Sequence, residues 1–104
     1  MRVSERLNFI ACDCGNSSIR VMLGSFDGGK IEIRTVVSEL NEMVLIGDYH
    51  YWDILHIFYV LKEGIKKALS MAGRIDSIGV CTWGVDFSLF DKDGLMLGNP
   101  LSYR

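Results

Sequence analysis

The chain has 104 residues, which is enough for one small domain with a modest hydrophobic core. A net charge of −2 lacks the basic excess that draws proteins to nucleic acid or to anionic membranes, so neither is expected as a partner. No apolar run reaches the roughly 18 residues of a membrane-spanning helix. The mostly polar start, Met1–Asn8, has no signal-peptide pattern, so we expect a cytoplasmic protein.

The sequence contains three cysteines, Cys12, Cys14 and Cys81. An odd number without framework spacing argues against a scaffold held by disulfides. Cys12 and Cys14 would lie on the same face of a strand, where a third thiolate from a neighbouring strand could complete a metal site. We favour the other interpretation, in which they are small buried hydrophobic residues in a reducing compartment.

The first forty residues predict a meander of three antiparallel strands. The apolar run Phe9–Cys12 is typical of a central strand buried on both faces. A polar turn over Asp13–Ser17 leads into a second strand, Ile19–Phe26. Asp27-Gly28-Gly29 indicates a tight hairpin, because glycine tolerates the positive φ that such turns need. Lys30–Val37 alternates apolar and polar residues, as in a strand with one wetter face.

A loop and a long helix follow the meander. Ser38–Tyr51 has no clean period and is expected to be a loop. From Trp52 to Ala72, apolar residues recur every three or four positions, which predicts one helix with an apolar face. Asp53 is expected in the first turn, where the helix dipole favours an anion, and Gly73 is a natural stop. The residues expected on the buried face are Ile54, Ile57, Phe58, Leu61, Ile65, Ala68, Leu69 and Ala72.

The remainder of the chain predicts two more strands and a hairpin. Ile75–Thr82 is expected as a second buried strand, broken by Trp83-Gly84, after which Val85–Phe90 continues as another strand. Asp91–Gly94 is a turn signal, and Leu95–Leu97 could pair back as a hairpin. The predicted class is α/β, with a mixed sheet and one long helix. This order of elements resembles the start of ribonuclease-H-like and actin-like ATPase domains.

The turn between Asp13 and Arg20 is the first candidate binding site. Asp13 ends a buried strand, and Gly15 is followed by the small polar run Asn16-Ser17-Ser18. Such a turn can direct several backbone N–H groups at a phosphate, while Gly15 leaves room for close approach. Arg20 offers a forked cation for phosphate, and Asp13 could hold magnesium through water. A plain polar hairpin turn explains these residues equally well.

A second candidate site lies in the run Ser77–Phe87, where a buried strand breaks. Trp83 can stack on the apolar face of a sugar ring, and Gly84 would let the backbone approach a ligand. Asp86 can accept hydrogen bonds from hydroxyl groups. Taken alone, this motif favours a core tryptophan beside a bend at the end of a strand.

The two motifs together give the chain a specific resemblance. The pattern Asp-x-Gly-x-Ser-Ser-x-Arg from Asp13 to Arg20 looks like the first phosphate-binding motif of FGGY carbohydrate kinases. The second motif resembles that of rhamnulokinases in particular, together with the residues that follow it and those before the helix: Leu89-Phe90-Asp91, Gly94, Tyr103-Arg104 and Tyr51-Trp52-Asp53. The resemblance covers nearly the whole chain but only the first part of such a kinase. We therefore expect residues 1–104 to be the start of the N-terminal actin-like ATPase domain, without the remainder.

This resemblance implies an ATP-dependent kinase that phosphorylates L-rhamnulose or a related ketose, with ATP and Mg²⁺ as cofactors. Asp13 would face the magnesium and the terminal phosphate, and Gly84 would contact the sugar, with Trp83 and Asp86 nearby. The general base of such kinases is an aspartate from later in the chain. No catalytic residue is therefore expected here, and the isolated chain is expected to be inactive. The expected ATP-binding residues are Asp13, Gly15, Asn16, Ser17, Ser18, Ile19 and Arg20.

The chain departs from the family pattern at several positions. Cys81 stands where an aspartate is usual, Cys14 replaces a common aliphatic residue, and Ile19 replaces a small residue. The stretch Ser38–Gly47 also matches poorly. These departures concern the identity of the sugar more than the family.

Two other functional classes stay open. A ribonuclease-H-like nuclease also begins with an aspartate on its first strand, but it needs further carboxylates around two metals. Glu32, Asp76 and Asp86 are not obviously placed for that. The other class is a non-catalytic, truncated actin-like module. We also expect the chain to self-associate, because one helix can cover only one face of an apolar sheet. Alternatively, Ser38–Tyr51 could fold back over the bare face and leave a monomer.

Overall fold

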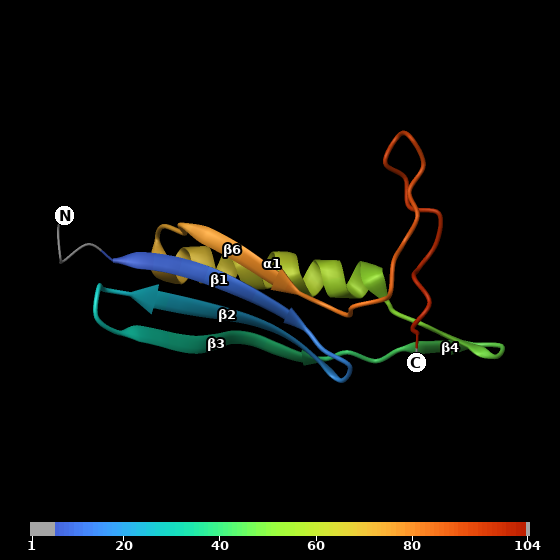
Figure 1. Ribbon diagram of the computed structural model, residues 1–104, viewed down its shortest axis with the longest axis horizontal. Helices are drawn as coiled ribbons and strands as arrows, with labels where there is room; N and C mark the ends of the chain where they lie inside the picture. Colours follow the sequence, from blue (N-terminus) through green and yellow to red (C-terminus); the bar gives the residue numbers. More distant parts are fainter. Residues whose placement is uncertain (1–5, 104) are drawn as a thin grey trace.

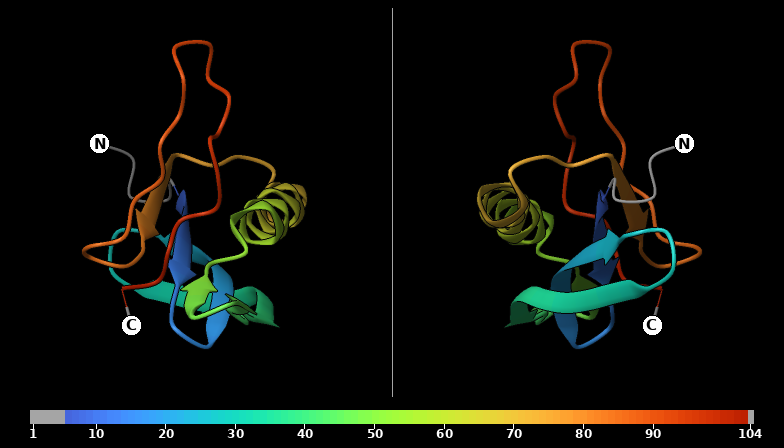
Figure 2. Two further views of the ribbon diagram at one scale, coloured as in Figure 1. Left: turned by 90° about the vertical axis from the view of Figure 1, so that its right-hand side faces the viewer. Right: turned by 90° about the vertical axis from the view of Figure 1, so that its left-hand side faces the viewer.

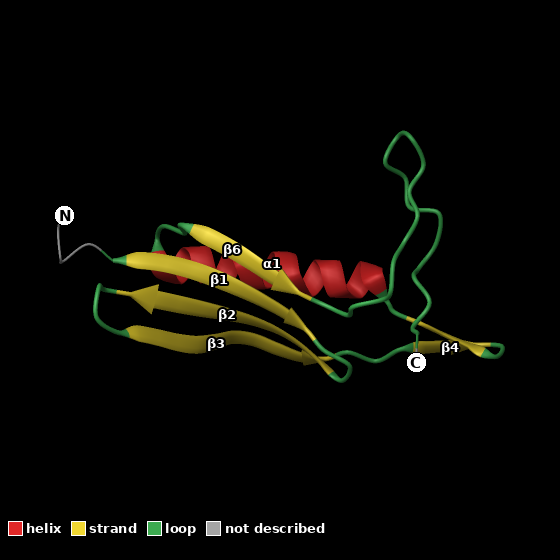
Figure 3. Ribbon diagram, in the orientation of Figure 1, coloured by secondary structure: helices red, strands yellow, loops and turns green. Residues whose placement is uncertain are grey.

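The computed structural model describes residues 6–103, which form a mixed sheet with one long helix beside it (Figures 1 and 3). Strands β1 (Leu7–Cys14), β2 (Ser18–Phe26) and β3 (Ile31–Leu40) form the predicted antiparallel meander. Strand β6 (Ser77–Cys81) pairs in parallel with β1, which gives the order β3-β2-β1-β6. The predicted mixed sheet with one long helix, α1 (Ile54–Ala72), is confirmed.

Both ends of α1 are capped by residues that the sequence singled out. Asp53 is the N-cap, and its side chain accepts a hydrogen bond of 3.3 Å from the His56 N–H, so it precedes the first turn and does not lie in it. Gly73 ends the helix with φ of 81°, and its N–H donates to the Leu69 carbonyl over 2.8 Å. Glycine adopts this left-handed conformation without a steric cost, which explains the predicted stop.

The buried face of α1 is centred on Gly64 and differs from the predicted one. An added Cβ at Gly64 would lie 2.5 Å from Cγ2 of Val21, so the missing side chain lets the helix approach β2 closely. Val60 and Gly64 are buried although neither was predicted to be. Phe58 and Leu69 were expected in the core, but they are 62% and 47% exposed. The buried stripe of α1 runs through Ile57, Val60, Gly64 and Ala68, which leaves Phe58 and Leu69 outside the contact.

The core between α1 and the sheet consists of two neighbouring clusters. One surrounds Ile10, Cys12 and Val21, and the other contains Cys14, Ile19 and Trp52. Burial disfavours the thiolate and raises the pKa of Cys14 to about 11, with the nearby Cys12 adding to the effect. Cys12 and Cys14 are therefore small buried hydrophobic residues, as we favoured.

The sheet is covered on one face only, as end-on views show (Figure 2). The helix contacts β1, β2 and β3 but not β6. Strand β1 therefore alternates between buried and more exposed residues, and the prediction of two buried faces is wrong. β6 was predicted to be buried, yet Ile78 and Val80 are 51% and 64% exposed. They lie beside Ile10 and Cys12 on the face toward the helix, but α1 does not reach β6, so their side chains stay uncovered among residues 6–103.

Strand β3 also presents its apolar row to solvent. Ile31 and Ile33 pair with Phe26 and Gly24 on the uncovered face and are 58% and 68% exposed. The alternation of apolar and polar residues predicted that one face of this strand would be wetter. At this end of β3 that polar face is the one toward the helix. A register shift between Val21 and Met22 changes the alternation, and Val36 enters the core as a result.

The segment Ser38–Tyr51 is not a loop. Strand β3 continues to Leu40, and β4 (Val44–Ile46) pairs with β5 (Tyr49–Tyr51) around Gly47, whose φ is 61°. This hairpin extends beyond the end of the sheet, so it does not fold back over the bare face (Figure 1). Short strands with exposed apolar side chains have no burial pattern that would reveal them, which explains the wrong prediction.

Beyond β6 the chain leaves the sheet as an irregular excursion, residues 82–97. It then runs back to the β4–β5 hairpin as the returning segment, residues 98–103 (Figure 1). The predicted strand Val85–Phe90 is absent, and the predicted pairing back is reduced to a bridge between Phe90 and Met96. The turn Asp91–Gly94 is confirmed, with φ of 87° at Gly94. Within the described part of the chain, no helix is long and apolar enough to cross a membrane. Arg104, part of the second motif's pattern, lies outside the described residues.

Candidate functional site

The two motifs meet at one end of the sheet. Strands β1 and β6 are parallel neighbours, and Asp13 near the end of β1 lies beside Cys81 at the end of β6. The first motif continues from β1 and the second from β6, so both emerge at the carboxyl ends of adjacent parallel strands. In open α/β sheets this edge is where ligands bind.

A buried asparagine holds the first turn in shape. The Gly15 N–H donates to the Ser18 carbonyl over 2.8 Å, which closes the turn. Asn41 is 4% exposed and donates from Nδ2 to the Gly15 carbonyl over 2.8 Å, while its backbone N–H reaches the Ser17 carbonyl over 3.0 Å. Sequence reasoning missed Asn41, because a single polar residue in an apparent loop gave no signal.

The residues of the first motif divide between solvent and core. Asn16, Ser17 and Arg20 are exposed, whereas Ile19 is 0% exposed and packs with Trp52 in the core. Only the backbone of Ile19 is therefore available to a ligand. At Gly15 an added Cβ would meet the Ser18 carbonyl oxygen at 3.4 Å, an ordinary contact, so the fold itself does not strictly require glycine there.

Asp13 and Arg20 form an ion pair across β1 and β2. Nη2 of Arg20 lies 2.7 Å from Oδ2 of Asp13, and the side chains are 46% and 34% exposed. They are direct cross-strand partners on the face that α1 leaves open. A pair this exposed contributes at most about 1 kcal/mol to stability. Both groups therefore remain accessible to a charged ligand.

The second motif is anchored by two stacked tryptophans. The rings of Trp52 and Trp83 lie 3.9 Å apart at 19°, so one face of Trp83 is already occupied by protein. Nε1 of Trp52 donates to Oδ2 of Asp86 over 2.6 Å, and Oδ1 of Asp86 accepts from the Tyr103 N–H over 2.9 Å. Both oxygens of Asp86 thus have protein partners, and this carboxylate ties the helix start to the returning segment. Trp52 is a site residue that sequence reasoning had not placed here.

Trp83 and Gly84 differ in their exposure to a ligand. Nε1 of Trp83 is buried and has no hydrogen-bond partner among residues 6–103. Gly84 is exposed, and an added Cβ there would meet nothing within 4 Å. The fold of the described residues therefore does not explain why glycine occupies this position, and it leaves open space beside the backbone.

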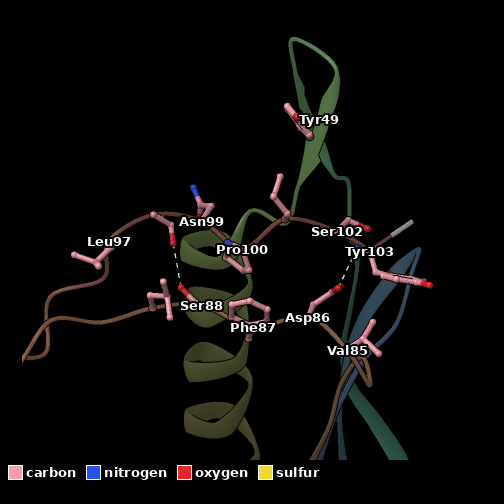
Figure 4. Close-up of a pocket in the computed structure, with 13 residues that line it drawn as sticks. Tyr49, Val85, Asp86, Phe87, Ser88, Leu97, Asn99, Pro100, Ser102 and Tyr103 are labelled. Atoms are coloured by element: carbon pink, nitrogen blue, oxygen red, sulfur yellow. Dashed lines mark hydrogen bonds between the residues drawn. The ribbon is translucent and has the colours of Figure 1, made fainter.

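A pocket of about 620 Å³ opens next to Asp86, between the irregular excursion and the returning segment (Figure 4). The returning segment is held in place by the Trp52 N–H, which donates to the Pro100 carbonyl over 3.0 Å, and by Ser88 Oγ, which donates to the Gly98 carbonyl over 3.0 Å. Asp86 lines this pocket, whereas Trp83 and Gly84 do not. A second pocket, of about 420 Å³, adjoins Asn8 and contains none of the predicted site residues.

The chain is similar to rhamnulokinases over almost its whole length. It is 39% identical over 97 residues to the rhamnulokinase of Bacteroides thetaiotaomicron, covering 93% of this chain and 20% of that enzyme. It is 41% identical over 97 residues to a Yersinia pestis rhamnulokinase and 37% identical over 97 residues to one from Klebsiella pneumoniae. Each of these matches covers 91% of this chain and 20% of the enzyme. No protein-family model matches the chain.

The fold of the chain matches that of part of a solved sugar kinase structure. A crystal structure of gluconate kinase from Lactobacillus acidophilus matches with a TM-score of 0.77 at 19% identity, over 94% of this chain and 20% of that one. The chain thus spans about one fifth of the length of the relatives that it matches. The predicted resemblance to an N-terminal segment of FGGY carbohydrate kinases is therefore confirmed.

Proposed function

We propose that this chain forms the phosphate-binding turn and part of the sugar site of an ATP-dependent carbohydrate kinase that phosphorylates L-rhamnulose or a related ketose. The observation that carries the proposal is the register of β1 with β6, which sets Asp13 beside Cys81 and brings both motifs to one edge. The similarity to rhamnulokinases supports the choice of ketose. As part of the same proposal, residues 1–104 constitute the beginning of the kinase's N-terminal domain.

The first turn has the donor set that the phosphates of ATP require. Arg20 offers an exposed guanidinium, and the exposed run Asn16-Ser17 adds backbone and side-chain donors. Asp13 is the acidic partner for Mg²⁺, held through water. In the proposed site Asp13 would hold the cation of magnesium ATP, and Arg20, which pairs with Asp13 at 2.7 Å, would be the cationic partner of the phosphate. Bound magnesium ATP supplies the phosphoryl group, and Asn41 keeps the turn in the shape that receives it.

The second motif provides the sugar side of the proposed site. Gly84 has open space where a side chain would stand, so a ring hydroxyl can approach the backbone. Trp83 stands beside Gly84 and is held by its stacking on Trp52, while its buried N–H is not open to a ligand. Asp86 has a positioning role in the proposed site. Its two oxygens accept hydrogen bonds from Trp52 Nε1 and from the Tyr103 N–H, and these bonds fix the bend. This differs from the expected direct contact of Asp86 with hydroxyls.

The proposal excludes turnover by the isolated chain. The resemblance assigns the general base to a later part of the kinase, and loss of such a base costs about 10²–10⁴-fold in rate. A truncated, non-catalytic module remains the alternative. A nuclease is disfavoured by position: Asp76 precedes β6 and Asp13 lies near the end of β1, so the two carboxylates lie at opposite ends of parallel neighbours.

A chimera tests the proposed function with the chain that is available. Residues 1–104 would replace the matching fifth of the Bacteroides thetaiotaomicron rhamnulokinase, and a coupled assay would compare L-rhamnulose, xylulose and glycerol with magnesium ATP. We expect phosphorylation of L-rhamnulose above the other two, and no turnover by the isolated chain. Equal or better turnover of xylulose or glycerol would contradict the substrate, and a folded but inactive chimera would contradict the kinase assignment.

A further inference from the structure

The carbonyl groups of the turn between β1 and β2 are mostly bound by donors of the chain itself. Asn41 Nδ2 donates to the Gly15 carbonyl over 2.8 Å, and the Asn41 N–H donates to the Ser17 carbonyl over 3.0 Å. The Gly15 N–H donates to the Ser18 carbonyl over 2.8 Å. Three of the four carbonyl groups from Gly15 to Ser18 are therefore occupied. All of these bonds form within residues 15–41, whatever else packs against the turn.

Asn41 reaches the turn from the end of the neighbouring strand. It directly follows β3 and is 4% exposed. Its backbone bond to Ser17 continues the pairing of β3 with β2, in which Leu40 lies opposite Ser18. Its side-chain bond to the Gly15 carbonyl is an addition to that pairing, and burial shields this bond from water. The side chain of Asn41 can therefore be changed without removing a bond of the sheet.

The bond to the Gly15 carbonyl sets the direction of the next N–H group. Peptide bonds are planar and trans, so the Asn16 N–H points opposite to the Gly15 carbonyl and away from Asn41. Asn16 is exposed, and its N–H has no hydrogen-bond partner among residues 6–103. The turn therefore presents an N–H group on its outer side, and not a carbonyl oxygen. Outward N–H groups of this kind form binding sites for anions.

We propose that Asn41 is a positioning residue, which holds the Gly15–Asn16 peptide so that the Asn16 N–H faces the phosphate. The inference rests on the proposed kinase function. Without the Asn41 amide this peptide is free to rotate, because glycine and asparagine both tolerate the left-handed conformations that rotation requires. Rotation would present the Gly15 carbonyl oxygen to the phosphate, and the two negative groups would repel each other. Asn41 is buried and acts only through the turn.

Calorimetric titration of the rhamnulokinase chimera with magnesium ADP tests the inference without turnover. Asn41→Leu keeps the volume but removes the amide donor, and it should weaken binding about ten- to hundredfold, as for the loss of one hydrogen bond to a charged group. KM for the ketose should stay nearly unchanged. The matched control is Asn8→Leu, because Asn8 is 9% exposed and its Nδ2 donates to the Arg74 carbonyl over 3.0 Å. This bond lies at the opposite end of β1, so the control should leave the affinity for magnesium ADP unchanged.

Asn41→Asp supplies a readout that a loss of stability would not produce. A carboxylate cannot donate to the Gly15 carbonyl but a protonated carboxyl can, so affinity relative to the parent chimera should recover from about pH 8.5 to about pH 5.5. A chimera that is merely destabilised would bind at fewer sites with unchanged affinity. Equal affinities for Asn41→Leu and Asn8→Leu, or no recovery of Asn41→Asp at low pH, would overturn the positioning role alone. A parent chimera that binds no magnesium ADP would overturn the proposed function, and this inference with it.

Discussion

Replacing Trp52 with phenylalanine tests the hydrogen bond that joins the helix start to the second motif. Nε1 of Trp52 donates to Oδ2 of Asp86 over 2.6 Å, and the residue is 1% exposed. A hydrogen bond to a charged acceptor contributes about 1.5–3 kcal/mol. Its loss should lower the free energy of unfolding by that amount, in addition to a packing cost. For a domain of this size, a loss of about 2 kcal/mol lowers Tm by roughly 8–16 °C.

Trp83→Phe is the matched control for this prediction. It removes the same atoms from the stacked partner ring, whose Nε1 has no acceptor among residues 6–103. Because the two tryptophans differ in burial, a double-mutant cycle with Asp86→Ala separates the hydrogen bond from packing. Urea unfolding followed by far-ultraviolet circular dichroism, at one protein concentration, gives the free energies. A coupling energy below about 0.5 kcal/mol between Trp52→Phe and Asp86→Ala would contradict a stabilising Trp52–Asp86 hydrogen bond.

Three further predictions concern Gly64 in the helix, the buried Cys14 and the exposed Cys81. Gly64→Ala should destabilise the fold by about 1–3 kcal/mol, because the new Cβ would overpack against Val21. The control is Gly29→Ala, whose new Cβ meets nothing within 4 Å. Equal urea midpoints for the two variants would contradict the prediction. Folding raises the pKa of Cys14 from 9.0 to about 11, so the associated stability is complete below the unfolded value and declines as the pH rises toward 11. Cys14→Ala should flatten that decline, and unchanged pH dependence would count against the burial argument. Cys81 is exposed and should react with a thiol reagent before Cys12 and Cys14, so simultaneous labelling of all three in the native chain would be the contrary result.

Local signals in the sequence predicted the meander and the ends of the helix. The turn Asp27-Gly28-Gly29 has φ of 100° at Gly28, and Oδ1 of Asp27 accepts from the Gly29 and Lys30 N–H groups over 3.2 and 3.1 Å. Each of these features depends on a few neighbouring residues with special backbone chemistry. Such features can be predicted without knowing what packs against them.

The errors arose where tertiary contacts decide the outcome. The run Ile78–Val80 is typical of a buried strand, but its burial depends on cover that α1, which does not reach β6, leaves out. The buried face of α1 is determined by Gly64, because its close approach to Val21 sets the contact. The spacing of apolar residues gives a glycine no weight, so it could not reveal this face. The bond between Trp52 and Asp86 joins positions 34 residues apart, beyond any local pattern. For the candidate site, both motifs could be found from sequence, whereas Asn41 and Trp52, which shape them, could not.

In the proposed function the turn at Arg20 holds ATP and the bend at Gly84 holds the sugar. Steady-state kinetics of the rhamnulokinase chimera measures this directly, with Arg20→Ala and Gly84→Ala as the two variants. Arg20→Ala should raise KM for magnesium ATP and leave KM for the ketose nearly unchanged, because it removes a phosphate contact. Gly84→Ala should do the reverse, since its new side chain enters space left open beside the backbone. If both variants change the same KM, or if neither changes any, the assignment of the two motifs is contradicted.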